Sequence, residues 1–453
     1  EKNSGFEELV AAGKAVFIPN DKSNVISMLE SKLKRDISIT NSYGYEIPDI
    51  LYHHRVIGNK YIFFVSNVSR ETTHFARISF GIRGKISEWD AVSGNISPVL
   101  SLYNGSYSVI DCEFPPVGSH IFIIEKGGRI QSVKKRPKQK SVLSINNTWK
   151  FKRVHPNSLT LDYCEYCIDN SSWSKKVPVW QAREAVIEAS GMKPYKGIQP
   201  WVLLQKGIKP NPVDVELRYK FLSEIKDADI SLVIEKASNF IISVNNQPVS
   251  TDNNNWHWDR QFGKINISKH VKKGDNIINL RCTYNSDVEI EDIYLIGDFA
   301  VKFLNTSKFA LTNEPDNLLT GSWVNQGYSF YAGNMLYRNS INLAKIERVK
   351  HIFLHIKNPC CSLLRVSVNN NEAGLLAWQP WEIDIKKFLK NGANTIEIEV
   401  VGSLRNTFGP LHHIGGDKLQ WVGPGEFSDI ANWTDTYHFA TYGILGGAEL
   451  VTY

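Results

Sequence analysis

Two stretches of the sequence, Ile265-Asn266-Ile267-Ser268-Lys269 and Ile383-Asp384-Ile385-Lys386-Lys387, share one pattern at a fixed separation (383 − 265 = 118). The matched positions that follow are Gly274, Asn276 and Ile278 in the first copy, and Gly392, Asn394 and Ile396 in the second. Alternation of apolar and polar residues is typical of a half-buried strand. Gly and Asn accept the positive φ angle of a tight turn. The sequence therefore predicts that one β-rich fold occurs twice.

The similarity continues upstream of these stretches. Tyr219 matches Tyr337 at the same offset, and Val244-Asn245-Asn246 matches Val368-Asn369-Asn370 at an offset of 124, so the intervening loop is six residues shorter in the second copy. Short strands joined by turns rich in Gly and Asn are typical of a jelly-roll β-sandwich. We therefore predict a first jelly-roll domain at 211–303 and a second at 304–453.

The rest of the chain divides into three further regions. We expect residues 1–47 to be the tail of a truncated α/β domain, with helices around Phe6 and Val25 and a short strand at 15–18, because so few α/β units cannot bury both faces of a sheet. Short runs of Ile, Val, Phe and Tyr predict an antiparallel β-sandwich at 48–133. A basic linker and a β-rich connecting segment are expected at 134–210. The predicted class is all-β, with tandem β-sandwich (jelly-roll) domains after a small truncated α/β segment.

Composition limits the possible partners. With 453 residues, 42% hydrophobic and 22% charged, the chain is long enough for several globular cores. The net charge of +6 is spread over 52 basic and 46 acidic side chains, and the one dense basic run, residues 134–140, reads as a solvated linker. We therefore expect no nucleic-acid partner. No apolar stretch approaches the roughly 18 residues of a membrane helix, so no membrane partner is expected either.

The sequence contains few residues in the patterns that bind metals or cofactors. Cys164 and Cys167 form a CxxC, but they lie in an alternating, strand-like run, where residues three apart point to opposite faces, so we interpret them as ordinary thiols. Adjacent His412 and His413 rarely bind one ion together, and no HExxH or EF-hand pattern is present. We expect no cofactor, although structural calcium held by loop oxygens remains possible in such sandwiches.

Several segments resemble a known enzyme family. The stretches Ile293 to Phe299 and Trp323 to Gly333 look like parts of the galactose-binding-like jelly rolls that accompany family 2 and family 106 glycoside hydrolases. Ser403 to His413 is similar to a C-terminal signature of large rhamnosidase-like proteins, and Trp89 to Gly94 resembles the β-domain that follows their barrel. The family's catalytic glutamates lie on that barrel, N-terminal to all of these stretches. The resemblance therefore assigns no catalytic residue to this chain.

The resemblance implies a function. We expect a non-catalytic C-terminal scaffold and carbohydrate-binding region of a large, α-L-rhamnosidase-like glycan-degrading enzyme, which would be secreted, periplasmic or at the cell surface. Its partners would be a glycan or oligosaccharide and the enzyme's own N-terminal catalytic region. Two alternatives stay open: a complete glycoside hydrolase with its active site between the last two domains, and a lectin-like surface protein.

Carboxylate pairs and aromatic loops decide between binding and catalysis. The pairs Glu289 with Glu291, Glu382 with Asp384, and Glu397 with Glu399 alternate with apolar residues, which predicts the solvent face of a strand rather than an active site. Two loop segments combine aromatic rings, which stack on sugars, with Arg and His, which bind hydroxyls. The predicted carbohydrate-binding residues are Trp323, Tyr328, Tyr331, Arg405, His412, His413, Trp421 and Trp433.

Overall fold

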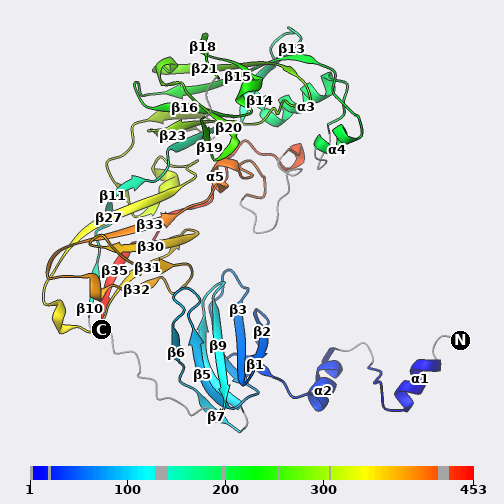
Figure 1. Ribbon diagram of the computed structural model, residues 1–453, viewed down its shortest axis with the longest axis vertical. Coiled ribbons are helices and arrows are strands. Elements are labelled where there is room, and N and C mark those ends of the chain that lie inside the picture. Colours follow the sequence, from blue (N-terminus) through cyan, green and yellow to red (C-terminus); the bar gives the residue numbers. More distant parts are fainter. Residues whose placement is uncertain are drawn as a thin grey trace. The chain divides into compact units, whose positions relative to one another are not determined.

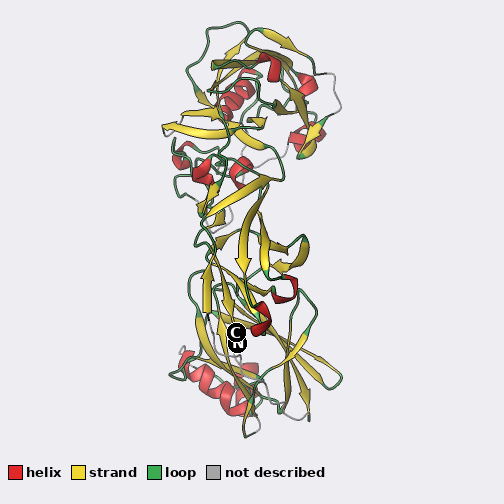
Figure 2. Cartoon of the chain, turned by 90° about the vertical axis from the view of Figure 1, so that its left-hand side faces the viewer, coloured by secondary structure: helices red, strands yellow, loops and turns green. Residues whose placement is uncertain are grey.

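The computed structural model describes residues 4–18, 22–105, 107–127, 141–194, 200–251, 255–305, 308–416 and 428–453. Strands make up most of the ordered structure (Figure 2), which confirms the predicted all-β class. The chain forms two compact units: Glu1–Lys138 with Trp378–Pro380, and Gln139–Ala377 with Trp381–Tyr453. No helix in the described ranges is both long and apolar enough to cross a membrane.

The first unit begins with two helices, α1 (Ser4–Ala11) and α2 (Lys22–Lys32), at the positions that the apolar spacing predicts. The strand predicted at 15–18 is wrong, because these residues have no regular structure. Val16 and Phe17 are exposed, and no described strand pairs with them. Without a hydrogen-bonded neighbour, an apolar run of this length does not form a strand.

Two antiparallel sheets complete the first unit (Figure 1). Their strand orders are β1-β4-β8-β7 and β2-β3-β9-β5-β6. The strands are β1 (Ile37–Thr40), β2 (Ile50–Ile57), β3 (Lys60–Asn67), β4 (His74–Phe80), β5 (Gly84–Trp89), β6 (Ile96–Pro98), β7 (Leu102–Asn104), β8 (Tyr107–Phe114) and β9 (Ser119–Lys126). Alternate residues of these strands, such as Phe63, Phe80 and Phe122, point inward and form the core between the sheets.

The second unit contains a first sandwich, which is drawn mainly in green in Figure 1. Its sheets have the orders β12-β22-β16-β20-β19 and β14-β13-β15-β21-β17-β18, and β24 pairs in parallel with the end of β15. Its elements are β12 (Asn157–Leu161), β13 (Tyr163–Ile168), β14 (Val177–Pro178), α3 (Val179–Ala189), α4 (Pro200–Gln205), β15 (Val213–Ser223), β16 (Ile230–Glu235), β17 (Ile241–Val244), β18 (Gln247–Val249), β19 (Trp256–His257), β20 (Asp259–Asn266), β21 (Gly274–Tyr284), β22 (Ile293–Gly297), β23 (Ala300–Asn305) and β24 (Lys308–Thr312).

The second unit also contains a second sandwich, whose strands come both before and after those of the first sandwich along the chain. Its sheets have the orders β10-β35-β28-β32 and β25-β11-β27-β33-β30-β31. Its strands are β10 (Ser141–Ser144), β11 (Thr148–Arg153), β25 (Leu318–Leu319), β27 (Asn334–Leu343), β28 (Ile352–Ile356), β30 (Leu363–Val368), β31 (Asn371–Leu376), β32 (Glu382–Asp384), β33 (Gly392–Val401) and β35 (Ala448–Thr452). Because β10 and β11 precede β12 while the other strands follow β24, the first sandwich is inserted into the second. The segment expected to connect domains, 134–210, thus supplies strands to both sandwiches.

The predicted repeat is confirmed by the strand orders. In the first sandwich β15, β21, β17 and β18 lie side by side, and in the second β27, β33, β30 and β31 lie in the same sequence of neighbours. Short 3-10 turns at Ser268–His270 and Lys386–Phe388 precede the equivalent strands β21 and β33. Tyr219 and Tyr337 are both completely buried, each in the core of its own sandwich.

The repeated Asn residues have one structural role. In the first sandwich Asn276 accepts a hydrogen bond from the backbone N–H of Lys272 at 2.8 Å and donates to the carbonyls of Lys272 and Gly274 at 2.7 and 2.9 Å. Asn245, from the Asn-Asn turn after β17, donates to the Asn276 side-chain oxygen at 2.8 Å. The two side chains therefore fix the turn that starts β21 to the β17–β18 hairpin.

The second sandwich repeats this arrangement. Asn394 accepts from the N–H of Lys390 at 2.9 Å and donates to the carbonyls of Lys390 and Gly392 at 2.7 and 2.9 Å, while Asn369 donates to Asn394 at 2.9 Å. The corresponding distances agree to within 0.1 Å. We call each Asn pair, Asn245 with Asn276 and Asn369 with Asn394, a clasp, because it fixes a turn to a hairpin. The motif that reveals the repeat therefore has a structural role rather than a binding role.

Candidate functional site

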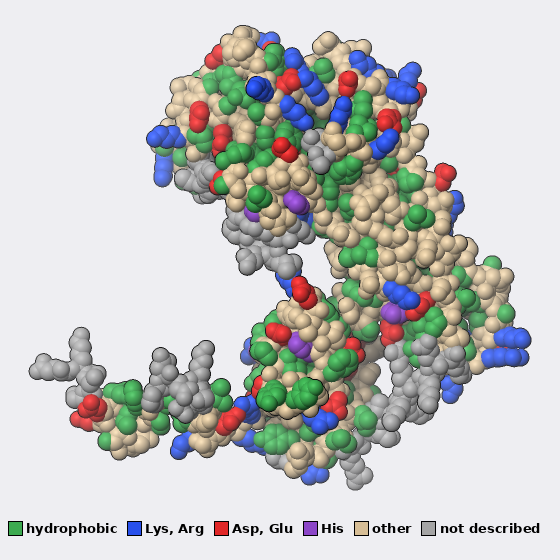
Figure 3. Space-filling view, turned by 180° about the vertical axis from the view of Figure 1, so that it is seen from behind, with side chains coloured by type: hydrophobic (Ala, Val, Ile, Leu, Met, Phe, Trp, Pro, Cys, Tyr) green, Lys and Arg blue, Asp and Glu red, His purple; other side chains and the backbone are tan. Residues whose placement is uncertain are grey.

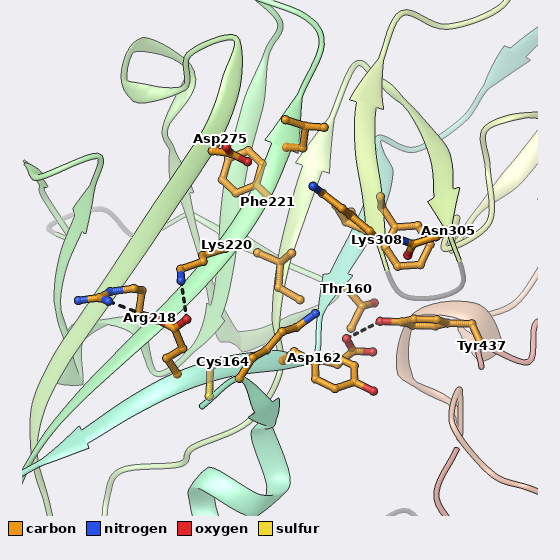
Figure 4. Close-up of a pocket in the computed structure, with 17 residues that line it drawn as sticks. Thr160, Asp162, Cys164, Arg218, Lys220, Phe221, Asp275, Asn305, Lys308 and Tyr437 are labelled. Atoms are coloured by element: carbon orange, nitrogen blue, oxygen red, sulfur yellow. Dashed lines mark hydrogen bonds and ion pairs between the residues drawn. The ribbon is translucent and has the colours of Figure 1, made fainter. Parts of the chain in front are cut away.

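The first sandwich carries an open cleft of about 380 Å³ (Figure 4). It lies where one edge of β15 changes its neighbour, since β13 pairs with Val215 to Arg218 and β24 pairs with Leu222 and Ser223. The opposite edge of β15 is paired with β21 along its whole length. In the described structure the residues between these pairings, 219–221, have no strand partner on the first edge, and the cleft occupies this interruption.

Charged residues of β13 and β15 form one wall of the cleft. Glu165 is bound by Arg218 at 3.2 Å and by Lys220, as the dashed lines in Figure 4 show. Partial desolvation raises the pKa of Glu165, but the hydrogen bonds and charges of Lys220 and Arg218 outweigh it and keep the pKa below its ordinary value. The Arg218 guanidinium also lies 3.7 Å from the ring centroid of Trp173. The position of Arg218 is thus fixed from both sides.

Asp162, between β12 and β13, is the most buried carboxylate of the cleft, with 6% of its surface exposed. It accepts a hydrogen bond from the Tyr437 hydroxyl at 2.6 Å and lies 3.0 Å from Nε2 of His412. The other ring nitrogen of His412, Nδ1, lies 2.7 Å from the carbonyl oxygen of Thr434. Because that carbonyl only accepts, Nδ1 is the nitrogen that donates to it, and Nε2 is the nitrogen that faces Asp162.

Aromatic rings line the cleft beside these polar groups. The Tyr163 hydroxyl donates to Asp435 at 2.6 Å, and desolvation raises the pKa of Tyr163 far above its ordinary value, which keeps the hydroxyl protonated. Phe309, on β24, packs edge to face on Tyr437 with ring centroids 4.9 Å apart. Since Tyr163 follows β12 and Phe309 lies on the β23–β24 hairpin, aromatic surface lines both sides of the cleft.

Four cations line the cleft, and two of them come from outside the wall of β13 and β15. Lys308 is the first residue of β24, and Figure 4 shows it beside Asn305 on the hairpin side of the cleft. Lys176, just before β14, lies on the other side, with its ammonium group 4.5 Å from the ring centroid of Tyr163. The cleft therefore combines hydrogen-bonding groups held in place by neighbours with aromatic surface and two flexible amines.

Three of the residues predicted to bind sugar are core residues. Trp323, Tyr328 and Tyr331 have at most 1% of their surface exposed and belong to the core of the second sandwich. The Tyr328 hydroxyl donates to Glu314 at 2.8 Å, and the Tyr331 hydroxyl donates to a backbone carbonyl. A ring without an exposed face cannot stack on a sugar, so the interpretation of these three as a stacking platform is corrected.

The other predicted residues that the structure describes lie in the C-terminal segment, and none of them lines the cleft. His412 is the partner of Asp162, and Trp433 stacks on the His412 ring with centroids 4.3 Å apart. His413 is buried, and Arg405 is partly buried with an Nη2 contact to the His438 carbonyl at 3.4 Å. Trp421 lies outside the described residues. Sugar binding by Arg405 and Trp433 stays a prediction.

Sequence reasoning missed the residues that do line the cleft. One feature of the sequence could have indicated Asp162, which directly follows the buried strand Asn157–Leu161. A charged residue at the end of a buried strand is stable only if another side chain binds it by a hydrogen bond or an ion pair. Arg218 and Lys220 alternate with apolar residues of β15 and look like any solvent-facing charges. Tyr437 comes from a segment distant in the sequence, and no local pattern links it to Asp162.

The carboxylate pairs behave differently from one another. Glu397 and Glu399 lie on β33 as predicted, where Glu397 binds Arg338 at 2.6 Å and Glu399 accepts from Asn334 at 2.7 Å. The strand predicted for Glu289 and Glu291 is wrong, because both lie in the loop before β22. Next to them, desolvation and the nearby charge of Asp162 raise the pKa of Asp292 well above its ordinary value.

Within the described ranges, no cluster of three or more His, Cys, Asp and Glu side chains is arranged to hold a metal ion.

Comparison with known proteins gives structural likenesses only. No protein-family model matches the sequence, and no curated protein matches it. A rhamnosidase from Novosphingobium sp. PP1Y is similar over 95% of this chain and 26% of its own, with 13% identity and a TM-score of 0.42. The α-L-rhamnosidase of Streptomyces avermitilis complexed with L-rhamnose is similar over 81% of this chain and 36% of its own, with 13% identity and a TM-score of 0.21. A β-D-mannosidase from Dictyoglomus thermophilum is similar over 58% of this chain and 31% of its own, with 12% identity and a TM-score of 0.21. The chain thus spans between 26% and 36% of the length of these three proteins.

Proposed function

We propose that this chain is a carbohydrate-binding region of a larger glycan-degrading enzyme, and that the cleft beside β15 is its sugar-binding site. The observation that carries the proposal is the combination, in one concave surface, of aromatic rings with charged groups held by fixed neighbours. A sugar ring offers hydroxyl groups around its edge and an apolar C–H surface on its face. Binding it requires both kinds of contact.

The polar groups suit hydroxyl recognition. Glu165 and Arg218 present adjacent acceptor and donor groups, which can bind neighbouring hydroxyls of one ring. Their mutual ion pair fixes these groups before a ligand arrives, so less conformational entropy is lost on binding. The volume of about 380 Å³ lies near the lower end of the range for small-ligand pockets, about 300 to 1,000 Å³. The proposed occupant is therefore a short end or a single branch of a glycan.

We do not propose catalysis at this cleft. Glycoside hydrolysis needs one carboxyl group to give a proton and another to attack or activate water. Asp162 is bound by Tyr437 and His412, and Glu165 is bound by Arg218 and Lys220. The resemblance to the family 106 enzymes supports the same division of labour, in which an N-terminal region performs the reaction outside the cell or in the periplasm.

Calorimetric titration with oligosaccharides tests the proposal. Arg218→Ala should weaken binding by about tenfold, because a charged hydrogen bond contributes about 1.5 kcal/mol or more. Arg281→Ala is the matched control, since Arg281 lies on the neighbouring strand β21 of the same sheet, is more exposed, and pairs with Glu216 outside the cleft. If both variants bind like the unmodified protein, or if no oligosaccharide binds to it, the cleft is not the sugar site.

A further inference from the structure

We infer that the sugar bound in this cleft carries a negative charge, as a uronate carboxylate or a sulfate ester does. This inference rests on the proposed function, because it names the class of saccharide that the same site takes. It is carried by a charge imbalance inside the cleft. On the face drawn in Figure 3, acidic and basic side chains are interspersed over the end of the second unit that carries the first sandwich.

The carboxylates of the cleft are largely compensated. Glu165 is compensated by two cations, Arg218 and Lys220. Asp162 is buried, accepts a hydrogen bond from Tyr437 and lies 3.0 Å from Nε2 of His412. These carboxylates therefore have little remaining capacity to attract a cation or to repel an anion.

Two lysines of the cleft, Lys176 and Lys308, form no ion pair in the described part of the chain. The Lys176 ammonium lies 4.5 Å from the ring centroid of Tyr163, and it also attracts the carboxylate of Asp435, which accepts a hydrogen bond from the Tyr163 hydroxyl. Lys176 lies on the β13 side and Lys308 on the β24 side, so the two amines flank the interruption in the edge of β15. The exposed carboxylate of Asp275 also lines the cleft, so the lining holds four cations, Lys176, Arg218, Lys220 and Lys308, against three carboxylates, Asp162, Glu165 and Asp275.

An anionic group on the bound sugar would complete this arrangement. Lys176 and Lys308 would both attract an anion in the cleft, and the charges of Arg218 and Lys220 together exceed the single charge of Glu165 by one. A neutral sugar can accept hydrogen bonds from these amines, but it gains no charge–charge attraction from them. Because the amines are exposed, salt weakens the attraction, with a screening length of about 8 Å at physiological ionic strength.

The test is calorimetric titration of the whole chain with three probes built on one sugar skeleton: an oligogalacturonate, a sulfated galacto-oligosaccharide and a neutral galacto-oligosaccharide. At low salt we expect at least one acidic probe to bind about tenfold more tightly than the neutral one, and this preference to shrink as salt is added. The acidic probe that binds more tightly identifies the source of the charge.

Single substitutions separate this inference from the proposed function. Lys176→Met and Lys308→Met should each weaken binding of the acidic probe by about three- to tenfold and weaken binding of the neutral probe clearly less, so that the preference for the acidic probe shrinks. The matched control is Lys209→Met, since Lys209 is exposed on the same sandwich but does not line the cleft. Equal, salt-independent affinity for all three probes, with binding still lost in Arg218→Ala, overturns the inference and leaves the proposed function standing. Absence of binding to every probe overturns both.

Discussion

Replacing Asn276 or Asn394 by Ala tests the structural repeat directly. Each side chain makes three hydrogen bonds to the backbone of its own turn and receives a fourth from a neighbouring Asn. A hydrogen bond contributes about 1 kcal/mol net, and water replaces part of what is lost at a turn, so each substitution should cost about 2–4 kcal/mol. The two costs should be similar, because the corresponding distances are nearly identical.

Urea unfolding followed by tryptophan fluorescence measures these costs, and hydrogen exchange locates them. Asn276→Ala should lower the protection of backbone amides against hydrogen exchange mainly in β20 and β21. Asn394→Ala should lower it mainly in β32 and β33. Asn342→Ala is the control, because Asn342 is exposed on β27, and its cost should stay within about 0.5 kcal/mol. If either clasp variant behaves like this control, or if loss of protection appears in the wrong sandwich, the proposed equivalence of the two clasps is wrong.

Three further outcomes are expected. Asp162→Ala should destabilise the second unit by about 3–5 kcal/mol in urea unfolding, because it removes the buried acceptor of Tyr437 and the buried partner of His412, whereas Asp162→Asn keeps an acceptor and should cost less. Leu354→Ala, at a completely buried core position, should cost about 2–5 kcal/mol by the same measurement. Desolvation lowers the pKa of His257 from 6.5 to about 4, so its contribution to stability is complete above pH 6.5 and is lost as the pH falls towards 4. After allowance for partial solvent exposure, we expect a loss of about 1 kcal/mol over that range, measured by thermal unfolding, and a flatter profile for His257→Gln.

The repeat could be predicted from the sequence because its signals are local. The Asn276 and Asn394 clasps, the turns before them and the alternation of their strands all lie within short stretches, so similar residues at similar spacing imply similar structure. The nesting of the sandwiches has no such signal. Residues 141–144 have the pattern of an ordinary strand, and only the folded chain shows that they pair with the last strand rather than with a nearby one.

The site was predicted less well for a related reason. Trp323, Tyr328 and Tyr331 lie among Gly, Asn and Ser, a composition typical of an exposed loop. In the structure a 3-10 turn at Trp323–Gln326, closed by Gly327 with a φ of 100°, directs these rings into the core. The cleft itself is assembled from strand edges, a hairpin and the C-terminal segment, so its shape depends on long-range packing that residue composition does not encode.

The insertion of one sandwich into the other has a consequence for the order of events during synthesis. Ser141 on β10 bonds Thr452 on β35, 311 positions later, which corresponds to roughly 15–60 s of translation at about 5–20 residues per second. During that time β10 lacks its partner β35. The strands of the inserted sandwich are synthesised in the same interval and can fold before β35 emerges. β35, which is synthesised after the other strands of this sandwich, then takes the place between β10 and β28. Removing only the final residues 448–453 would therefore leave two unpaired strand edges facing each other across a gap, and we expect such a shortened nascent chain to aggregate.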